Sequence, residues 1–197
     1  MRAGERGIDE AVRMTDEELV ARLRAGDRDA MAAVFDQYAD RVYNACFRRT
    51  ASWSMAEDAM AATFLEVWRI RDRATAYDGD LLPWLCAVAT NVCRNTVRSA
   101  RRQSLLRAKL TVVEGIAAHD PSDEVAGRVD DEQRMGQVLE AMDGLSRADR
   151  EVLMLVAWDG LTYAQAAAAL GVAVGTVRSR MSRSRSRLAG LLGQEEA

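Results

Sequence analysis

Residues 161–188, with the sequence LTYAQAAAALGVAVGTVRSRMSRSRSRL, constrain the fold of this chain more than any other segment. Thr162 and Gln165 have the spacing of a capping box, which begins a helix. Gly171 is suited to end that helix because glycine adopts a left-handed backbone at little cost. A second helix is expected from Thr176 to the end of the segment. Two helices joined by a short apolar turn are typical of a helix-turn-helix, whose second helix enters the DNA major groove.

The second helix of this pair has an apolar side and a basic side when its residues are placed about 100 degrees apart. The side expected to pack inward carries Val174, Val177, Met181, Ser184 and Leu188. Small hydroxyls and arginines on the other side can approach base edges and phosphates. A solvated surface helix is the alternative, but residues 160–194 contain no acid to offset the arginines. The candidates for DNA contact are Thr176, Arg178, Ser179, Arg180, Ser182, Arg183 and Arg187.

The whole chain of 197 residues has the pattern of an all-α protein, because apolar residues recur at helical spacing and only two prolines interrupt them. Helix starts are expected at Thr15 with Glu18, at Asp29, at Ser54 with Glu57, at Pro83, and at Ser146 with Asp149. The helix after Pro83 is expected to extend to about Arg102. No apolar run reaches membrane-spanning length and the N-terminus is too charged for a signal peptide, so a cytoplasmic protein is expected.

Charge is segregated along the chain, although the net charge is only -3. Residues 91–109 carry six basic side chains and no acid, whereas residues 114–132 carry seven acids and one arginine. Two basic blocks separated by an acidic segment suggest two contacts with nucleic acid joined by a flexible linker. The expected division is a tail (1–14), a helical domain (15–104), a linker (105–130), a second helical domain (131–192) and a short tail (193–197).

The helix after Pro83 is expected to carry the first of these contacts. One polar stripe, at steps of four, three and four residues, is formed by Asn91, Asn95, Arg98 and Arg102, and Arg94 and Arg101 lie beside it. Amides and arginines on one helix suit base edges and phosphates together, and the alternative is a solvated face. Trp84 is assigned to the core in preference to stacking on an unpaired base. The candidates on this helix are Trp84, Asn91, Asn95, Arg98, Arg101 and Arg102.

Three segments carry a resemblance to a known family. Residues 161–188 resemble region 4, the promoter-reading domain of bacterial sigma factors of the extracytoplasmic-function (ECF) group. Residues 56–69, AEDAMAATFLEVWR, resemble the helix of region 2 that docks on the clamp of core RNA polymerase. Residues 82–98, LPWLCAVATNVCRNTVR, resemble the segment of region 2 that melts the promoter and reads the minus-ten element.

The resemblance implies roles for individual residues. Asn91 would help to hold a flipped base, and residues 73–81 would form the loop that receives it. The residues that would face or support the polymerase clamp are Glu57, Asp58, Phe64, Leu65 and Trp68. The two acids can instead stabilise a helix N-terminus, and the two aromatic rings can instead belong to the core. The chain departs from the family at Asn95, where aspartate is common, and at Ala61 and Ala62, where larger polar residues are common.

These features together favour an ECF-type sigma factor that binds core RNA polymerase and promoter DNA. The resemblance also implies an anti-sigma partner, with no membrane insertion, no small-molecule substrate, no cofactor and no catalytic activity. A helix-turn-helix regulator that binds duplex DNA without polymerase is the main alternative. An enzyme is a third class, but one histidine and three cysteines without CxxC spacing offer little for catalysis or zinc binding. Those cysteines are expected to be buried, and an oxidation-sensing role for Cys86 and Cys93 is left open.

Overall fold

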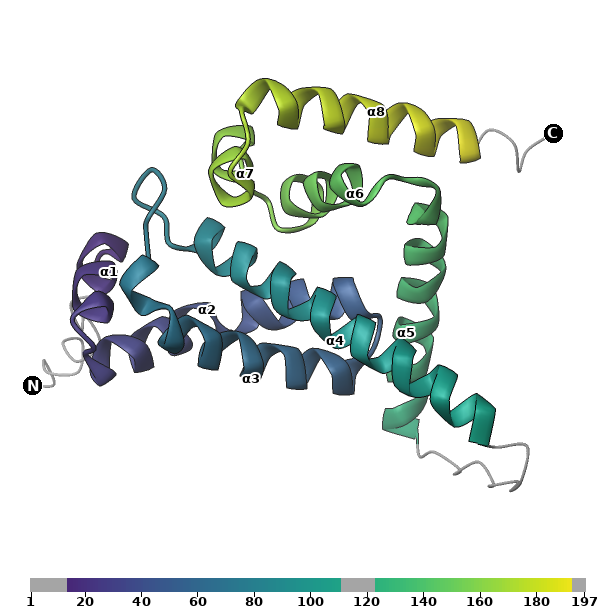
Figure 1. Cartoon of the computed structure of the whole chain (residues 1–197), viewed down its shortest axis with the longest axis horizontal. Coiled ribbons are helices and arrows are strands. Elements are labelled where there is room, and N and C mark those ends of the chain that lie inside the picture. The colour runs from purple at the N-terminus through teal and green to yellow at the C-terminus, as the bar shows by residue number, and fades with distance from the viewer. Residues whose placement is uncertain (1–13, 111–122, 193–197) are drawn as a thin grey trace, which may run out of the picture.

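The computed structural model describes residues 14–110 and 123–192, and within this part of the chain every regular element is a helix (Figure 1). The predicted all-α class is therefore confirmed. The first four α-helices are α1 (Asp16–Arg24), α2 (Arg28–Thr50), α3 (Trp53–Arg69) and α4 (Leu82–Leu110), with a short 3-10 helix at Arg71–Arg73. They are followed by α5 (Asp123–Ala141), α6 (Arg147–Leu153), α7 (Tyr163–Leu170) and α8 (Val174–Leu192), with a 3-10 turn at Met142–Gly144 and a π-helical turn at Met154–Trp158.

The N-terminal half is a bundle in which α2, α3 and α4 pack on one another and α1 packs across the start of α2. Fully buried aliphatic side chains from all three long helices form its core, among them Val34, Val67 and Leu85. In the C-terminal half, α8 packs on both α6 and α7. None of the described helices is both long enough and apolar enough to cross a bilayer.

Most of the predicted helix starts agree with the structure. Thr15 and Thr162 each form a complete capping box, and Ser146 accepts a hydrogen bond from the backbone of Asp149. Gly171 ends α7 with a left-handed backbone, at φ 63°. Pro83 is the second residue of α4, where its missing N–H leaves no hydrogen bond unmade.

Two predicted caps were wrong by two residues. Asp27, not Asp29, caps α2, because its carboxylate accepts hydrogen bonds from the backbone of Asp29 and Ala30. Ser52, not Ser54, caps α3 by accepting from the backbone of Met55. In both cases a residue with positive φ just before the cap, Gly26 or Ala51, turns the chain early enough to start the helix there.

The central and last helices are longer than predicted. Helix α4 continues past Arg102 to Leu110, and α5 begins at Asp123, so the described ends of the expected linker (105–130) are helical. Residues 111–122 lie outside the described part. Helix α8 begins at Val174 rather than Thr176, because the carbonyl of Ala173 already accepts from the backbone N–H of residues 176 and 177.

Candidate nucleic-acid interface

Helix α8 is held against α6 by the side that the sequence assigned to packing. Val177, Met181 and Ser184 are buried, and the Ser184 hydroxyl donates to the carbonyl of Asp149 at 3.1 Å. Val174 was wrongly assigned to this side, because it is the first residue of the helix and 41 % of it is exposed. The remaining sides of α8 are therefore free to meet a ligand.

The candidate DNA-contacting residues of α8 lie on those remaining sides. Five of them are exposed: Arg178, Ser179, Ser182, Arg183 and Arg187. Thr176 and Arg180 are half-buried. No acidic residue of α8 interrupts this surface, so its charge is wholly positive.

Arg183 is the exception among these residues because it has an acidic partner. Its guanidinium donates to Asp149 Oδ1 at 3.0 Å, from α8 to the first turn of α6. Burial disfavours the charged carboxylate, but hydrogen bonds from Arg183 and Ser146 outweigh it and hold the pKa of Asp149 below its usual value. DNA would therefore have to compete with Asp149 for this arginine.

The polar stripe of α4 is largely exposed, as predicted. Asn91, Asn95, Arg98, Arg101 and Arg102 all reach the surface of the described structure. Trp84 does not, because only 7 % of it is exposed and its ring belongs to the core. Trp84 therefore belongs to the core, which was the interpretation preferred over stacking on an unpaired base. Its indole ring is not accessible to a base in this conformation.

The turn before α4 is shaped by an acidic residue from the first helix. Asp16 Oδ2 accepts from the backbone N–H of Leu81 at 2.8 Å and also hydrogen bonds with Tyr38. The turn itself is closed by backbone hydrogen bonds between Tyr77 and Asp80. This fixes residues 77–81 beside the start of α4, where the family resemblance places a base-receiving loop.

The candidate polymerase-contacting residues lie on α3, and they divide into exposed and buried groups. Glu57 and Asp58 are exposed, and Leu65 presents 72 % of its surface to solvent. Phe64 is buried, with its ring 4.8 Å from that of Phe35, and Trp68 is half-buried. The acids and Leu65 can thus contact a partner directly, while Phe64 supports the helix from inside.

The two halves of the protein are joined by a buried ion pair that the sequence did not reveal. Arg49 of α2 donates to Asp159, just after the π-helical turn, through Nη1 to Oδ1 at 3.2 Å and Nη2 to Oδ2 at 2.5 Å. The two side chains are only 5 % and 2 % exposed. Arg48 also donates to the carbonyl of Trp158. Partners 110 residues apart leave no local pattern in a sequence, so no motif could have found them.

Two further contacts hold the C-terminal half over α4. Arg94 donates to Glu151 Oε1 at 2.7 Å, and Gln165 Nε2 donates to Asp80 Oδ2 at 3.2 Å. Helix α7 also packs on α4 directly, and Figure 1 shows α6, α7 and α8 gathered on that side of the helix. We call this set of contacts, from Arg49–Asp159 to Gln165–Asp80, the domain junction.

The three cysteines are buried and unpaired. A hydrogen bond with Cys93 and burial raise the pKa of the Cys46 thiol, and burial raises the pKa of Cys86 to about 12. The same hydrogen bond with Cys46 lowers the pKa of the Cys93 thiol. Among the described residues, no group of three or more His, Cys, Asp or Glu side chains is arranged to hold a metal ion.

Two family models match the chain in order. Residues 34–103 match the model for Sigma-70 region 2, and residues 135–188 match the model for Sigma-70, region 4. The first match spans α2 to α4, and the second spans the end of α5 to most of α8.

Comparisons with individual proteins agree with the two family models. The ECF RNA polymerase sigma factor SigK of Mycolicibacterium vanbaalenii is 34% identical over 83% of this chain and 82% of its own length. The structure of CnrH in complex with the cytosolic domain of CnrY is similar in fold, with a TM-score of 0.65 at 22% identity over 91% of this chain and 97% of the other. The sigma factor RpoE of Bartonella quintana, solved with the anti-sigma factor NepR, has a TM-score of 0.54 at 26% identity, over 81% and 94%.

Proposed function

The chain belongs to the ECF group of bacterial RNA polymerase sigma factors, and from this membership we propose which of its surfaces contacts each partner. Sigma factors of this group bind core RNA polymerase and promoter DNA, and they initiate transcription at chosen promoters. The observation that carries the assignment is the order of two family domains on one chain, with an exposed basic helix face in each. A stand-alone helix-turn-helix regulator would not need the region 2 domain, so the comparisons favour the sigma factor.

The C-terminal domain reads the minus-thirty-five element through α8. Arg178, Ser182 and Arg187 are exposed on this helix, and their side chains suit guanine edges and phosphates. Small serines between the arginines let the helix backbone approach the groove closely. This supports insertion of α8 into the major groove, with the buried side of the helix kept against α6.

The N-terminal domain captures the minus-ten strand with α4 and the turn before it. Asn91 and Asn95 offer amides to unpaired base edges, and Arg98, Arg101 and Arg102 offer guanidinium groups to the backbone. Favourable contacts with an extruded base offset the cost of unpairing it. Trp84 takes part as the buried support of this surface and not as a stacking platform.

Helix α3 contacts the polymerase clamp. Leu65 is a large apolar side chain with 72 % of its surface exposed, so a partner that covers it removes apolar surface from water. Glu57 and Asp58 add negative charge to the same helix, although Glu57 also lies 3.6 Å from Arg128 of α5. We assign Phe64 and Trp68 a supporting role on its inner side.

The domain junction must open when both promoter elements are bound. Arg94 beside the minus-ten stripe is engaged by Glu151 of the C-terminal half. This pair occupies an arginine that phosphates would otherwise attract. The closed arrangement is therefore a resting form of the free protein.

An anti-sigma factor is the expected regulatory partner, as in the Bartonella quintana relative solved with one. We also propose that the protein catalyses no reaction of its own and acts in the cytoplasm, where RNA polymerase works. Its contribution to initiation is then binding and positioning alone.

The test is transcription in vitro with purified core RNA polymerase on a library of genomic promoter fragments, with and without the protein. Initiation that depends on the protein, at start sites sharing two spaced elements, is the expected result. Duplex binding by the protein alone, without any initiation, would overturn the proposal in favour of the stand-alone regulator.

A further inference from the structure

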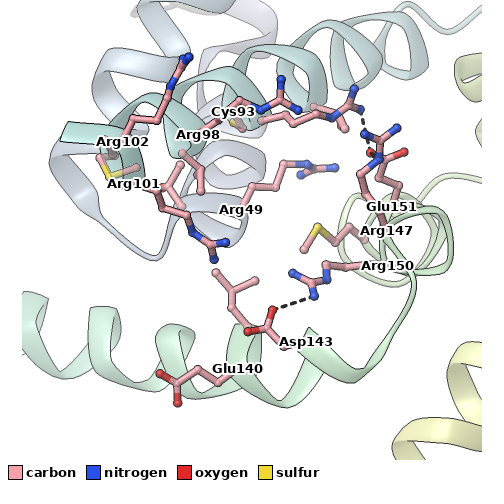
Figure 2. Close-up of a pocket in the computed structure, with 18 residues that line it drawn as sticks. Arg49, Cys93, Arg98, Arg101, Arg102, Glu140, Asp143, Arg147, Arg150 and Glu151 are labelled. Carbon is pink, nitrogen blue, oxygen red and sulfur yellow. Dashed lines mark hydrogen bonds and ion pairs between the residues drawn. The ribbon is translucent and has the colours of Figure 1, made fainter. Parts of the chain in front are cut away.

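A cavity of about 770 Å³, open to solvent, lies between the two halves of the protein beside the domain junction. Helices α2 and α4 line it from the N-terminal half, and α5 and α6 line it from the C-terminal half (Figure 2). Its size lies within the range of about 300–1,000 Å³ that is usual for small-molecule sites. A cavity of this kind is suited to a compact ligand and not to a nucleic acid duplex.

The lining of the cavity is strongly basic. Seven arginines and three acidic residues contribute to it, and one of the arginines, Arg49, also neutralises Asp159 outside the cavity. The acids are partly occupied already, since Glu151 pairs with Arg94 and Asp143 pairs with Arg150. An excess of positive charge therefore remains for an anion.

The arginines of the lining divide into buried and exposed side chains. Arg49 is buried and Arg150 is half-buried, and both already donate to other protein groups. The guanidinium groups that a ligand in the cavity can reach belong to the exposed side chains of Arg98, Arg101, Arg102 and Arg147. Figure 2 shows the side chains of Arg49 and Arg150 reaching into the space between the helices, with Arg101 extending toward α5 from above.

The rest of the lining is apolar. Met55, Val97, Leu139 and Met154 contribute side chains from both halves of the protein. Methionine side chains adapt to the shape of a flat or irregular ligand. The cavity thus combines an apolar surface with guanidinium donors, and such donors favour phosphate because they bind it in pairs.

We propose that this cavity binds a small phosphorylated molecule with an apolar or planar body, of the nucleotide class. The phosphates lie among Arg98, Arg101 and Arg147, and the body lies on the apolar lining. Because the ligand contacts both halves at once, its binding stabilises the closed domain junction. Arg98, Arg101 and Arg102 of the lining are also assigned above to the minus-ten strand, so the ligand and the promoter compete for them.

The test is isothermal titration of the full chain with ATP, inorganic triphosphate and adenosine in magnesium-free buffer at about 0.15 M salt, where long-range attraction is screened. ATP is the expected ligand of the three, with triphosphate weaker and adenosine weaker still. Arg101→Gln and Arg147→Gln each remove one lining charge from a surface-exposed side chain, so neither should unfold the protein. Each should weaken ATP binding about tenfold or more, since charge-assisted contacts are lost.

The matched control is Arg178→Gln, which removes the same charge from α8, outside the cavity. Unchanged ATP affinity in this variant supports the cavity as the site. An equal loss in Arg178→Gln, or no binding of ATP to the full chain, overturns the proposal. Triphosphate that binds as tightly as ATP overturns the role given to the apolar lining.

Discussion

Replacing Asp159 by asparagine tests whether the buried ion pair with Arg49 holds the two halves together. Asparagine keeps the shape of the side chain but removes its charge, so Arg49 is left as a buried cation with no counter-charge. The asparagine amide can still offer its oxygen to one guanidinium nitrogen. Its NH₂ group then faces the second nitrogen, which in the native protein lies 2.5 Å from a carboxylate oxygen.

The size of the effect follows from the burial of both side chains. Removing one partner of a buried ion pair typically costs about 3–5 kcal/mol of folding stability, because the remaining charge has lost its hydration and has no opposite charge to compensate for it. Arg49 keeps its hydrogen bond to the carbonyl of Ala45 at 2.8 Å, so we expect a loss near the lower end, ~3 kcal/mol. For a chain of this length that loss lowers the melting temperature by roughly 6–12 °C.

The assay is urea unfolding followed by circular dichroism, with a double-mutant cycle. Arg49→Met combined with Asp159→Leu replaces both charges by apolar groups and should recover most of the loss. Asp143→Asn is the control, because its pair with Arg150 is at the surface and should be worth less than about 1 kcal/mol. A loss below about 1 kcal/mol in Asp159→Asn, or a double variant as unstable as the sum of the single ones, would refute the reasoning.

Three further predictions concern other parts of the molecule. Arg178→Ala should weaken promoter binding by about 1–3 kcal/mol if it reads a base, measured by titration on matched and mismatched duplexes, and an equal loss on all sequences would indicate a phosphate contact. Charge reversal of Glu57 and Asp58 together should lower polymerase binding in a pull-down while leaving circular dichroism unchanged. The pKa of Asp149 is lower in the folded protein than in the unfolded chain. The ionised carboxylate therefore stabilises the fold fully above the ordinary pKa of aspartate, and this stabilisation is lost as the pH falls through the pKa of the folded state. Asp149→Asn should remove that acid sensitivity in unfolding curves measured at successive pH values.

Local signals allowed much of the fold to be predicted from the sequence. The capping box of Thr162 with Gln165 and the glycine at 171 act within a few residues, so the pattern and the structure agree. The start of α3 was misplaced because Ser54 has a glutamate three residues later, as in a capping box, whereas Ser52 has not. A tertiary contact accompanies the earlier start, since the ring of Trp53 stacks on Phe47 with centroids 3.9 Å apart.

The candidate site was predictable as a set of helix faces but not as a surface of the whole molecule. Periodicity places Arg94 beside the stripe of α4, yet only the structure reveals that Glu151 from the other half engages it. The same limit applies to Arg49, whose charge on a helix of an apolar bundle gives no sign of a partner at Asp159. Periodicity reports which residues share a face, whereas what covers that face depends on residues far away in the chain.

The contacts of the domain junction affect the stability and the activity of the protein in opposite directions. If the junction opens on a promoter, every contact that strengthens it in the free protein raises the free energy needed to reach the active form. A variant with a tighter junction would therefore resist heat better and initiate transcription less well. Stabilising substitutions at helix caps within one half, such as the capping box at Thr15, would avoid this trade-off.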